Sequence, residues 1–106
     1  MVILEFSVTP LGVGEGVSKY VARCLEIVEQ SGLDYQLHAM GTLVEGELTQ
    51  VLEVVQHCME AVAADCSRVT CAAKLDYRAR HSGRLVKKVA SVEEKLGKRV
   101  RKANGE

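Results

Sequence analysis

Residues 33–47, LDYQLHAMGTLVEGE, decide the fold predicted for this chain. Apolar side chains occupy every second position from Leu33 to Ala39, which is typical of a half-buried strand. Gly41 permits a turn or bulge, residues 42–45 continue as a short third strand, and Gly46 ends it. Two strands therefore follow each other directly in the middle of the chain, with no helix between them.

Working outward, the remaining segments place one helix and one strand on each side of this pair. Residues 2–9 alternate with a period of two and predict a first strand, which Pro10 and the glycines at 12, 14 and 16 end. Residues 17–28 and 48–62 carry apolar stripes at helical spacing, and Ser31-Gly32 closes the first of these helices. Residues 69–78 alternate again and predict a fourth strand.

The resulting order, β-α-β-β-α-β, is that of the ferredoxin-like α+β sandwich. Right-handed crossovers place both helices on one face of a four-stranded antiparallel sheet. A further helix over residues 83–96 has no place in this two-layer core, and we expect it to pack on the open side of the sheet or against a neighbouring subunit. Residues 1–97 form one domain in this interpretation, and residues 98–106 a basic, flexible tail.

Charge is balanced overall but divided along the chain. The 106 residues include 14 Lys+Arg and 14 Asp+Glu. Residues 1–65 hold ten acids and two bases, a net charge of −8, and residues 66–106 hold twelve bases and four acids, a net charge of +8. A balanced chain is a poor general nucleic-acid binder, because such proteins need excess positive charge. The longest apolar runs have four residues, too short for a membrane helix, and no secretory signal is visible, so we expect a soluble cytoplasmic protein.

Cysteine and histidine spacings argue against a metal site or catalysis. The four cysteines contain no Cys-x-x-Cys pair, and Cys24, Cys58 and Cys71 fall on predicted apolar faces, as expected of structural thiols. His38, His57 and His81 sit on three different segments without ligand spacing. The glycines at 12, 14 and 16 fail the dinucleotide pattern, which requires glycine at position 17, where Val17 stands. No cofactor or catalytic group is indicated.

The face of the sheet opposite the helices is predicted to display a mixed polar set. Such a surface suits a small polar ligand or a partner subunit, although a solvated face explains it equally well. Its predicted members are Glu5, Ser7, Thr9, Gln36, His38, Met40, Lys74, Asp76 and Arg78.

Several segments resemble a family of small thiamine-binding proteins, long known only as conserved hypothetical proteins. The resemblance extends from residue 2 to about residue 97, and its two most specific parts are Ser-Val-x-Pro-x-Gly and Met-Gly-Thr-x-x-Glu-Gly. One departure is Ala39, where many relatives have proline, and Arg80 and His81 lie in a loop that varies. The matching segments are Ser7-Val8-x-Pro10-Leu11-Gly12, Tyr20-Val21-Ala22, Met40-Gly41-Thr42-x-Val44-Glu45-Gly46-Glu47, Arg68-Val69, Lys74-Leu75-Asp76-x-Arg78 and Lys88-Val89-x-Ser91-Val92-Glu93-Glu94-Lys95.

The resemblance implies a ferredoxin-like fold that assembles into homodimers or homotetramers, with no established enzymatic activity and with thiamine or its hydroxymethylpyrimidine part as ligand. An aminopyrimidine offers an amine beside a ring nitrogen, which an acid or amide satisfies in pairs. Glu45 or Glu47 near the Gly41 turn, with Thr42 and Ser7, could supply this contact, so we expect Glu45→Gln to weaken binding. The cationic thiazolium favours a carboxylate or an aromatic face, for which Tyr20, Tyr35 or another acid is available. The expected binding residues are Ser7, Tyr20, His38, Met40, Gly41, Thr42, Glu45, Glu47, Lys74 and Asp76, at the sheet or at a subunit interface.

Two other classes of function remain open from the residues. A small enzyme on this fold is one, although an acylphosphatase would need an arginine in the first loop and residues 9–18 contain none. A regulatory or structural oligomer that binds another protein is the other. If the extra helix reaches a neighbouring subunit, the +8 and −8 parts of the chain would meet there and favour assembly.

Overall fold

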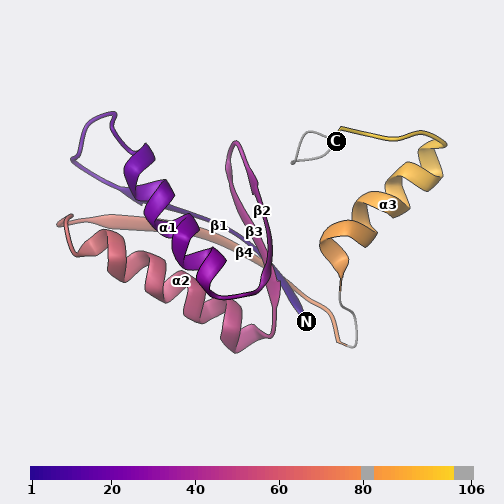
Figure 1. Cartoon of the computed structure of the whole chain (residues 1–106), viewed down its shortest axis with the longest axis horizontal. Coiled ribbons are helices and arrows are strands. Elements are labelled where there is room, and N and C mark those ends of the chain that lie inside the picture. The colour runs from indigo at the N-terminus through magenta and orange to yellow at the C-terminus, as the bar shows by residue number, and fades with distance from the viewer. Residues whose placement is uncertain (80–82, 102–106) are drawn as a thin grey trace.

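The computed structural model describes residues 1–79 and 83–101. Its elements follow the predicted order, including the expected further helix after the fourth strand (Figure 1). Each predicted element is present, and most boundaries shift by only one to three residues. The elements are β1 (Val2–Pro10), α1 (Ser18–Gln30), β2 (Asp34–His38), β3 (Gly41–Gly46), α2 (Leu48–Ala63), β4 (Val69–Tyr77) and α3 (Arg84–Leu96).

The four strands form one antiparallel sheet in the order β2-β3-β1-β4. Figure 1 shows α1 and α2 side by side in one layer over this sheet. This arrangement confirms the predicted α+β ferredoxin-like sandwich. β1 is an inner strand with a neighbour on both sides, whereas β2 and β4 form the two edges.

The two ladders of β1 differ in length. β1 pairs with β4 along its whole length, from Val2–Tyr77 to Pro10–Val69. Its pairing with β3 ends at Phe6–Thr42, because the chain reaches the β2–β3 turn there. Residues 7–10 of β1 therefore extend beyond the end of β3 on that side.

The main core lies between the sheet and the two helices. Val2, Leu4 and Phe6 of β1 point toward the helices and are buried, as predicted from their two-residue spacing. Burying a side chain of this size stabilises a fold by about 1.5–3 kcal/mol. From the other elements, the buried residues of this core are Val28, Val44, Val51, Val54 and Cys58. A smaller cluster of Tyr20, Val62 and Cys66 joins the start of α1 to the end of α2.

The third helix is attached to the sheet near its N-terminal end, through Arg84 and Lys88. The backbone N–H of Arg84 donates to Glu45 Oε2 at 2.9 Å, and its guanidinium pairs with Asp76, both on the open face. Lys88 Nζ binds the same Asp76 carboxylate at 2.7 Å. Arg84 and Leu85 are buried, whereas Val86, Val92 and Leu96 are more than half exposed. The rest of α3 extends beside the sheet (Figure 1).

Local hydrogen bonds explain the boundary that shifts most. The second strand was expected over residues 33–40 but ends at His38, because the Met40 N–H donates to His38 Nδ1 and turns the chain.

At the other end of the chain, the Val100 N–H donates to Glu93 Oε2 at 2.8 Å. His81 and residues 102–106 of the expected tail lie outside the described residues.

Replacing Asp76 by asparagine should release the first turn of α3. The substitution removes the charge that holds both Arg84 and Lys88, so amide hydrogen exchange over residues 85–96 should become severalfold faster while β1 stays protected. Asp34→Asn is the matched control, because Asp34 also lies on the open face and has no ion pair in the described part of the chain. Equal exchange in the two variants would contradict this account.

Acid should release α3 in the wild-type protein as well. The hydrogen bond from Lys88, supported by Arg84, holds the pKa of Asp76 below its ordinary value, against the opposing effect of burial. A carboxyl with a depressed folded-state pKa contributes stability above its unfolded-state pKa, about 4, and loses it as the pH falls through the folded-state pKa. Because intrinsic amide exchange itself slows in acid, the quantity to compare is the protection factor, the intrinsic rate divided by the observed rate. The protection factor over α3 should fall in acid in the wild type, with a smaller change in Asp76→Asn.

Candidate functional site

A cavity of about 360 Å³ lies where β1 extends beyond β3. Its walls come from the second half of β1, the first half of α1 and the β2–β3 turn. This volume is in the range of small-molecule sites, and most of the side chains are apolar, as is usual for such sites. The lining residues are Phe6, Ser7, Val8, Thr9, Pro10, Val17, Val21, Cys24, Leu37, His38, Ala39, Met40, Gly41 and Thr42.

The main chain of residues 7–10 runs along this cavity. Residues 7–10 of β1 have β4 on one side and no strand on the side of β3, where the ladder has already ended. Successive residues of a strand direct their N–H and C=O groups to opposite sides. Alternate residues of this stretch therefore present backbone donors and acceptors toward the cavity.

The β2–β3 turn is held tightly against β1. A Cβ atom added at Gly41 would lie 2.9 Å from the backbone oxygen of Phe6, closer than real Cβ atoms come to other heavy atoms. Gly41 thus allows the backbones of β3 and β1 to approach at the edge of the cavity. Its neighbour Met40 is 84% exposed at the tip of the turn.

His38 is oriented by this turn. Because Nδ1 accepts from the Met40 N–H at 3.2 Å, a neutral imidazole carries its proton on Nε2. Nε2 lies 3.2 Å from Glu5 Oε2, within ion-pair distance, but the geometry is not that of a hydrogen bond and this buried atom has no hydrogen-bond partner. A donor and a carboxylate therefore stand beside each other at this end of the cavity.

Of the ten residues expected from the sequence to bind ligand, the structure brings five together and places five elsewhere. Those that line the cavity are Ser7, His38, Met40, Gly41 and Thr42. Ser7 and Thr42 belong to opposite faces of the sheet, because Thr42 pairs with the inward-pointing Phe6 and Ser7 is its neighbour. They meet at the cavity only because it lies at the end of β3.

The two glutamates expected near the Gly41 turn, Glu45 and Glu47, do not reach it. Glu45 is four residues further along β3, only 2% exposed, and bonded to the Arg84 N–H. Glu47 is the N-cap residue of α2, where its N–H donates to Gln50 Oε1 at 2.9 Å. Both are occupied in structural contacts away from the cavity.

The other three expected residues also have structural contacts or lie on the open face. Tyr20 is buried with Val62 and Cys66, and Lys19 Nζ lies 5.0 Å from the centre of its ring. Lys74 is exposed on the open face opposite Glu5, and Asp76 anchors α3. Tyr35, the other candidate partner for a thiazolium, donates its hydroxyl proton to Glu29 Oε1 at 2.9 Å.

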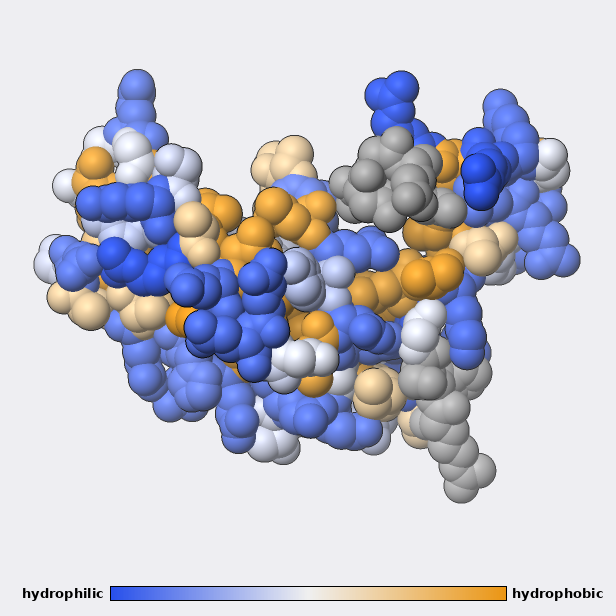
Figure 2. All heavy atoms as spheres, viewed as in Figure 1, coloured by the Kyte–Doolittle hydropathy of each residue, from blue (hydrophilic) through white to orange (hydrophobic). Residues whose placement is uncertain are grey.

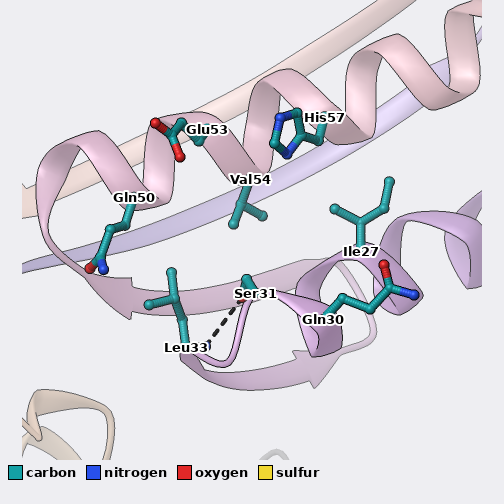
Figure 3. A pocket seen from close by; sticks show the side chains of 8 residues that line it. All are labelled: Ile27, Gln30, Ser31, Leu33, Gln50, Glu53, Val54 and His57. Atoms are coloured by element: carbon teal, nitrogen blue, oxygen red, sulfur yellow. Dashed lines mark hydrogen bonds between the residues drawn. The ribbon is translucent and has the colours of Figure 1, made fainter.

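A second cavity, of about 440 Å³, lies between the end of α1 and the start of α2 (Figure 3). Figure 3 shows Glu53 and His57 of α2 and Gln30 of α1 around it, with the apolar side chains of Val54 and Leu33. None of the ten expected residues lines it. Although it is larger, it is the less apolar of the two and does not include either of the most specific sequence motifs.

Within residues 1–79 and 83–101, no group of three or more His, Cys, Asp or Glu side chains is arranged to hold a metal ion. None of the helices described there combines the length and hydropathy that a membrane span requires.

Comparison with known proteins identifies the family. The family model described as thiamine-binding protein matches residues 4–93. The chain belongs to the thiamine-binding protein family. This match includes both segments that form the mouth of the first cavity, residues 7–10 and 39–42.

Relatives and solved structures agree with this family. The chain is 46% identical over 96 residues to a UPF0045 protein of Mycobacterium bovis, covering 90% of this chain and 94% of the relative. The crystal structure of a hypothetical protein from Methanocaldococcus jannaschii superimposes with a TM-score of 0.81 at 33% identity, over 88% of this chain and 96% of that one. A candidate thiamine biosynthesis or salvage protein of Thermotoga maritima, at 23% identity and a TM-score of 0.69, covers 91% and 95% of the two chains and shares the fold.

Sequence reasoning missed the apolar half of this candidate site. Val17, Val21 and Leu37 line the cavity, and their helical or strand spacing marked them only as core residues. Each is instead 37–43% exposed. The signal that distinguishes them is the early end of the β1–β3 ladder, which depends on strand register and cannot be seen in local spacing.

Gly41→Ala should disturb both the stability of the protein and the cavity. The new methyl group would press on the Phe6 carbonyl in the centre of the sheet, so we expect a loss of about 1–3 kcal/mol in the free energy of unfolding, measured with urea. Gly16→Ala is the matched control, because a Cβ there meets nothing within 4 Å. If the two variants unfold at the same urea concentration, the close approach of β3 and β1 is not required.

Proposed function

We propose that this protein binds thiamine, or its hydroxymethylpyrimidine part, without catalysis in the cavity between β1, α1 and the β2–β3 turn. The single observation that carries the proposal is that five of the expected binding residues meet in one cavity, which lies within the segment matched by the thiamine-binding family. The name of the Thermotoga maritima protein, which refers to thiamine biosynthesis or salvage, is consistent with it.

The unpaired edge of β1 suits an aminopyrimidine. This ring presents an amine donor next to a ring-nitrogen acceptor, the same alternation of donor and acceptor that a neighbouring strand would offer. A pyrimidine beside residues 7–10 would thus take the place that β3 leaves vacant, with Val21 and Leu37 covering its apolar faces.

Charge favours a cation at the His38 end of the cavity. The carboxylate of Glu5 stands next to His38, and no lysine or arginine lines the cavity among the residues that the structure describes. The thiazolium of thiamine is a permanent cation and would gain from this carboxylate. The phosphate groups of thiamine esters would find no basic side chain among the described lining residues and would be repelled by this carboxylate, so we expect thiamine to bind more tightly than its diphosphate.

Binding without catalysis follows from how the reactive side chains of the cavity are used. The Cys24 thiol contacts the Cys58 carbonyl, and His38 Nδ1 accepts from the Met40 N–H. In catalysis by a thiol–base pair the two groups are hydrogen-bonded to each other, and no such bond joins Cys24 and His38 among the described residues. A small enzyme is therefore the weaker alternative.

Calorimetric titration tests the proposal. We expect saturable binding of thiamine and of hydroxymethylpyrimidine to the wild type. Val21→Phe should weaken it at least about tenfold, or ~1.4 kcal/mol, by filling the cavity. Glu53→Gln, in the second cavity, and Glu45→Gln, under α3, are controls that should bind normally. Absence of binding by folded wild type would overturn the proposal, and loss of binding in Glu45→Gln alone would move the site to the open face.

We further propose that the protein self-associates through α3, as a homodimer or homotetramer. In Figure 2, apolar side chains are visible on the surface around α3. Leu85, Val89, Val92 and Leu96 share one side of the helix, and the last two are more than half exposed. A second copy is the partner we favour, because the basic C-terminal part of one chain complements the acidic first part of another.

Light scattering after size-exclusion chromatography tests this assembly. Val92→Asp should lower the molar mass of the particle, because it places a charge in the proposed apolar contact. Ser91→Asp, on the opposite side of α3, should leave it unchanged. A monomeric wild type would overturn the proposal.

A further inference from the structure

Two thiols meet where α1 and α2 pack together. Cys24 Sγ lies 3.9 Å from the Cys58 carbonyl oxygen, and Cys58 Sγ lies 3.6 Å from the Cys24 carbonyl oxygen. Such a reciprocal contact requires the two backbones to approach closely at this point. Each thiol thus lies against the main chain of the other residue, with α1 and α2 in contact at this point.

The two thiols are not equivalent. The hydrogen bond from Cys58 lowers the pKa of Cys24 despite partial burial, and the guanidinium charge of Arg23 acts in the same direction. The bond to Cys24 and burial together raise the pKa of Cys58 far above its ordinary value. Since the thiolate is the nucleophile, Cys24 is the more reactive of the pair.

Access also differs between the cysteines. Cys24 is half-buried and lines the candidate ligand cavity, whereas Cys58 is fully buried behind it. Cys66 is buried in the smaller cluster with Tyr20 and Val62, against which Cys24 also packs. A small oxidant that enters the cavity therefore meets Cys24 first and finds Cys58 next to it.

We propose that Cys24 and Cys58 are a redox-active pair, which a hydroperoxide converts into a disulfide between α1 and α2, and that this disulfide weakens ligand binding in the adjacent cavity. The second half of the proposal rests on the proposed function, and the first half does not.

The reaction balances with a hydroperoxide as the only oxidant. The Cys24 thiolate attacks one peroxide oxygen, the O–O bond breaks, and the products are a Cys24 sulfenic acid and, after protonation of the leaving oxygen, water or an alcohol. Cys58 sulfur then attacks the Cys24 sulfur, and its proton leaves with the departing hydroxide as water. Two thiols and one hydrogen peroxide thus give one disulfide and two waters.

The disulfide would change the wall of the cavity. Bonded sulfur atoms are about 2.05 Å apart, whereas heavy atoms in nonbonded contact stay about 3.5 Å apart or more. Drawing Cys24 toward Cys58 therefore shifts the cavity side of α1, which also carries Val17 and Val21. By linkage, a ligand that prefers the dithiol form must favour that form by the same factor.

Mass spectrometry of the full chain with hydrogen peroxide tests the disulfide without any ligand. We expect the wild type to lose two hydrogens, to keep two of its four thiols, and to yield a peptide joined through Cys24 and Cys58. Cys66→Ala is the matched control and should form the same disulfide. Cys58→Ala, or Cys58→Ser if the alanine variant does not fold, should instead trap a Cys24 sulfenic acid that dimedone labels. Four unreacted thiols, a bond to Cys66 or Cys71, or a bond between chains would overturn the proposal.

Calorimetry on the two forms tests the coupling. Thiamine should bind the oxidised protein at least about fivefold more weakly than the reduced protein, and a dithiol should restore the original affinity. Cys58→Ser, treated in the same way, should not form the disulfide and should show a smaller change. Equal affinities of the two wild-type forms would overturn the coupling but leave the disulfide intact. No binding to the reduced form would overturn the proposed function, while the mass measurement still decides the disulfide.

Discussion

The site depends on one constraint, the unequal pairing of β1 with its two neighbours. β4 pairs with β1 as far as Pro10. The pairing of β3 with β1 ends at Phe6–Thr42, because the chain turns between His38 and Gly41. If β3 paired with β1 as far as β4 does, it would form hydrogen bonds with the backbone groups of residues 7–10. Because β3 does not pair with residues 7–10, the cavity lies beside these residues, and α1 forms one of its walls. A ligand whose hydrogen-bond donors and acceptors alternate like those of a strand would fit there.

The polar residues of the open face are divided between two tasks at opposite ends of β3. At the Gly41 end, Glu5 and His38 stand beside the cavity. At the Gly46 end, Glu45 and Asp76 hold the first turn of α3. Burying Glu45 would be costly on its own, but the N–H of Arg84 at the start of the helix offsets part of that cost. One strand thereby separates the candidate ligand cavity from the attachment of the third helix.

Much of the fold could be predicted from the sequence, and less of the site. Two-residue alternation around Phe6 and helical spacing around Val51 report local burial, and these patterns gave the correct order of elements. The family resemblance placed segments near Ser7 and Met40 in one expected site, and both segments line the first cavity. Glu45, by contrast, was expected beside Thr42. Its carboxylate instead accepts from the N–H of Arg84, which lies 39 positions later in the chain. The register of β3 against β1 and the position of α3 bring these two residues together. Such long-range contacts leave no trace in local spacing.

The third helix, α3, is attached to the sheet near its N-terminal end, through Arg84 and Lys88. Its 13 residues span ~20 Å, and its hydrogen bonds to β3 and β4 come from Arg84 and Lys88. A small rotation at that end is therefore magnified into a displacement of several ångströms at Leu96. The ion pairs at Asp76 thus set not only whether the helix is attached but also where its far end stands in space. A distance probe between the tip of α3 and the body would report changes at Asp76 and Glu45 with high sensitivity.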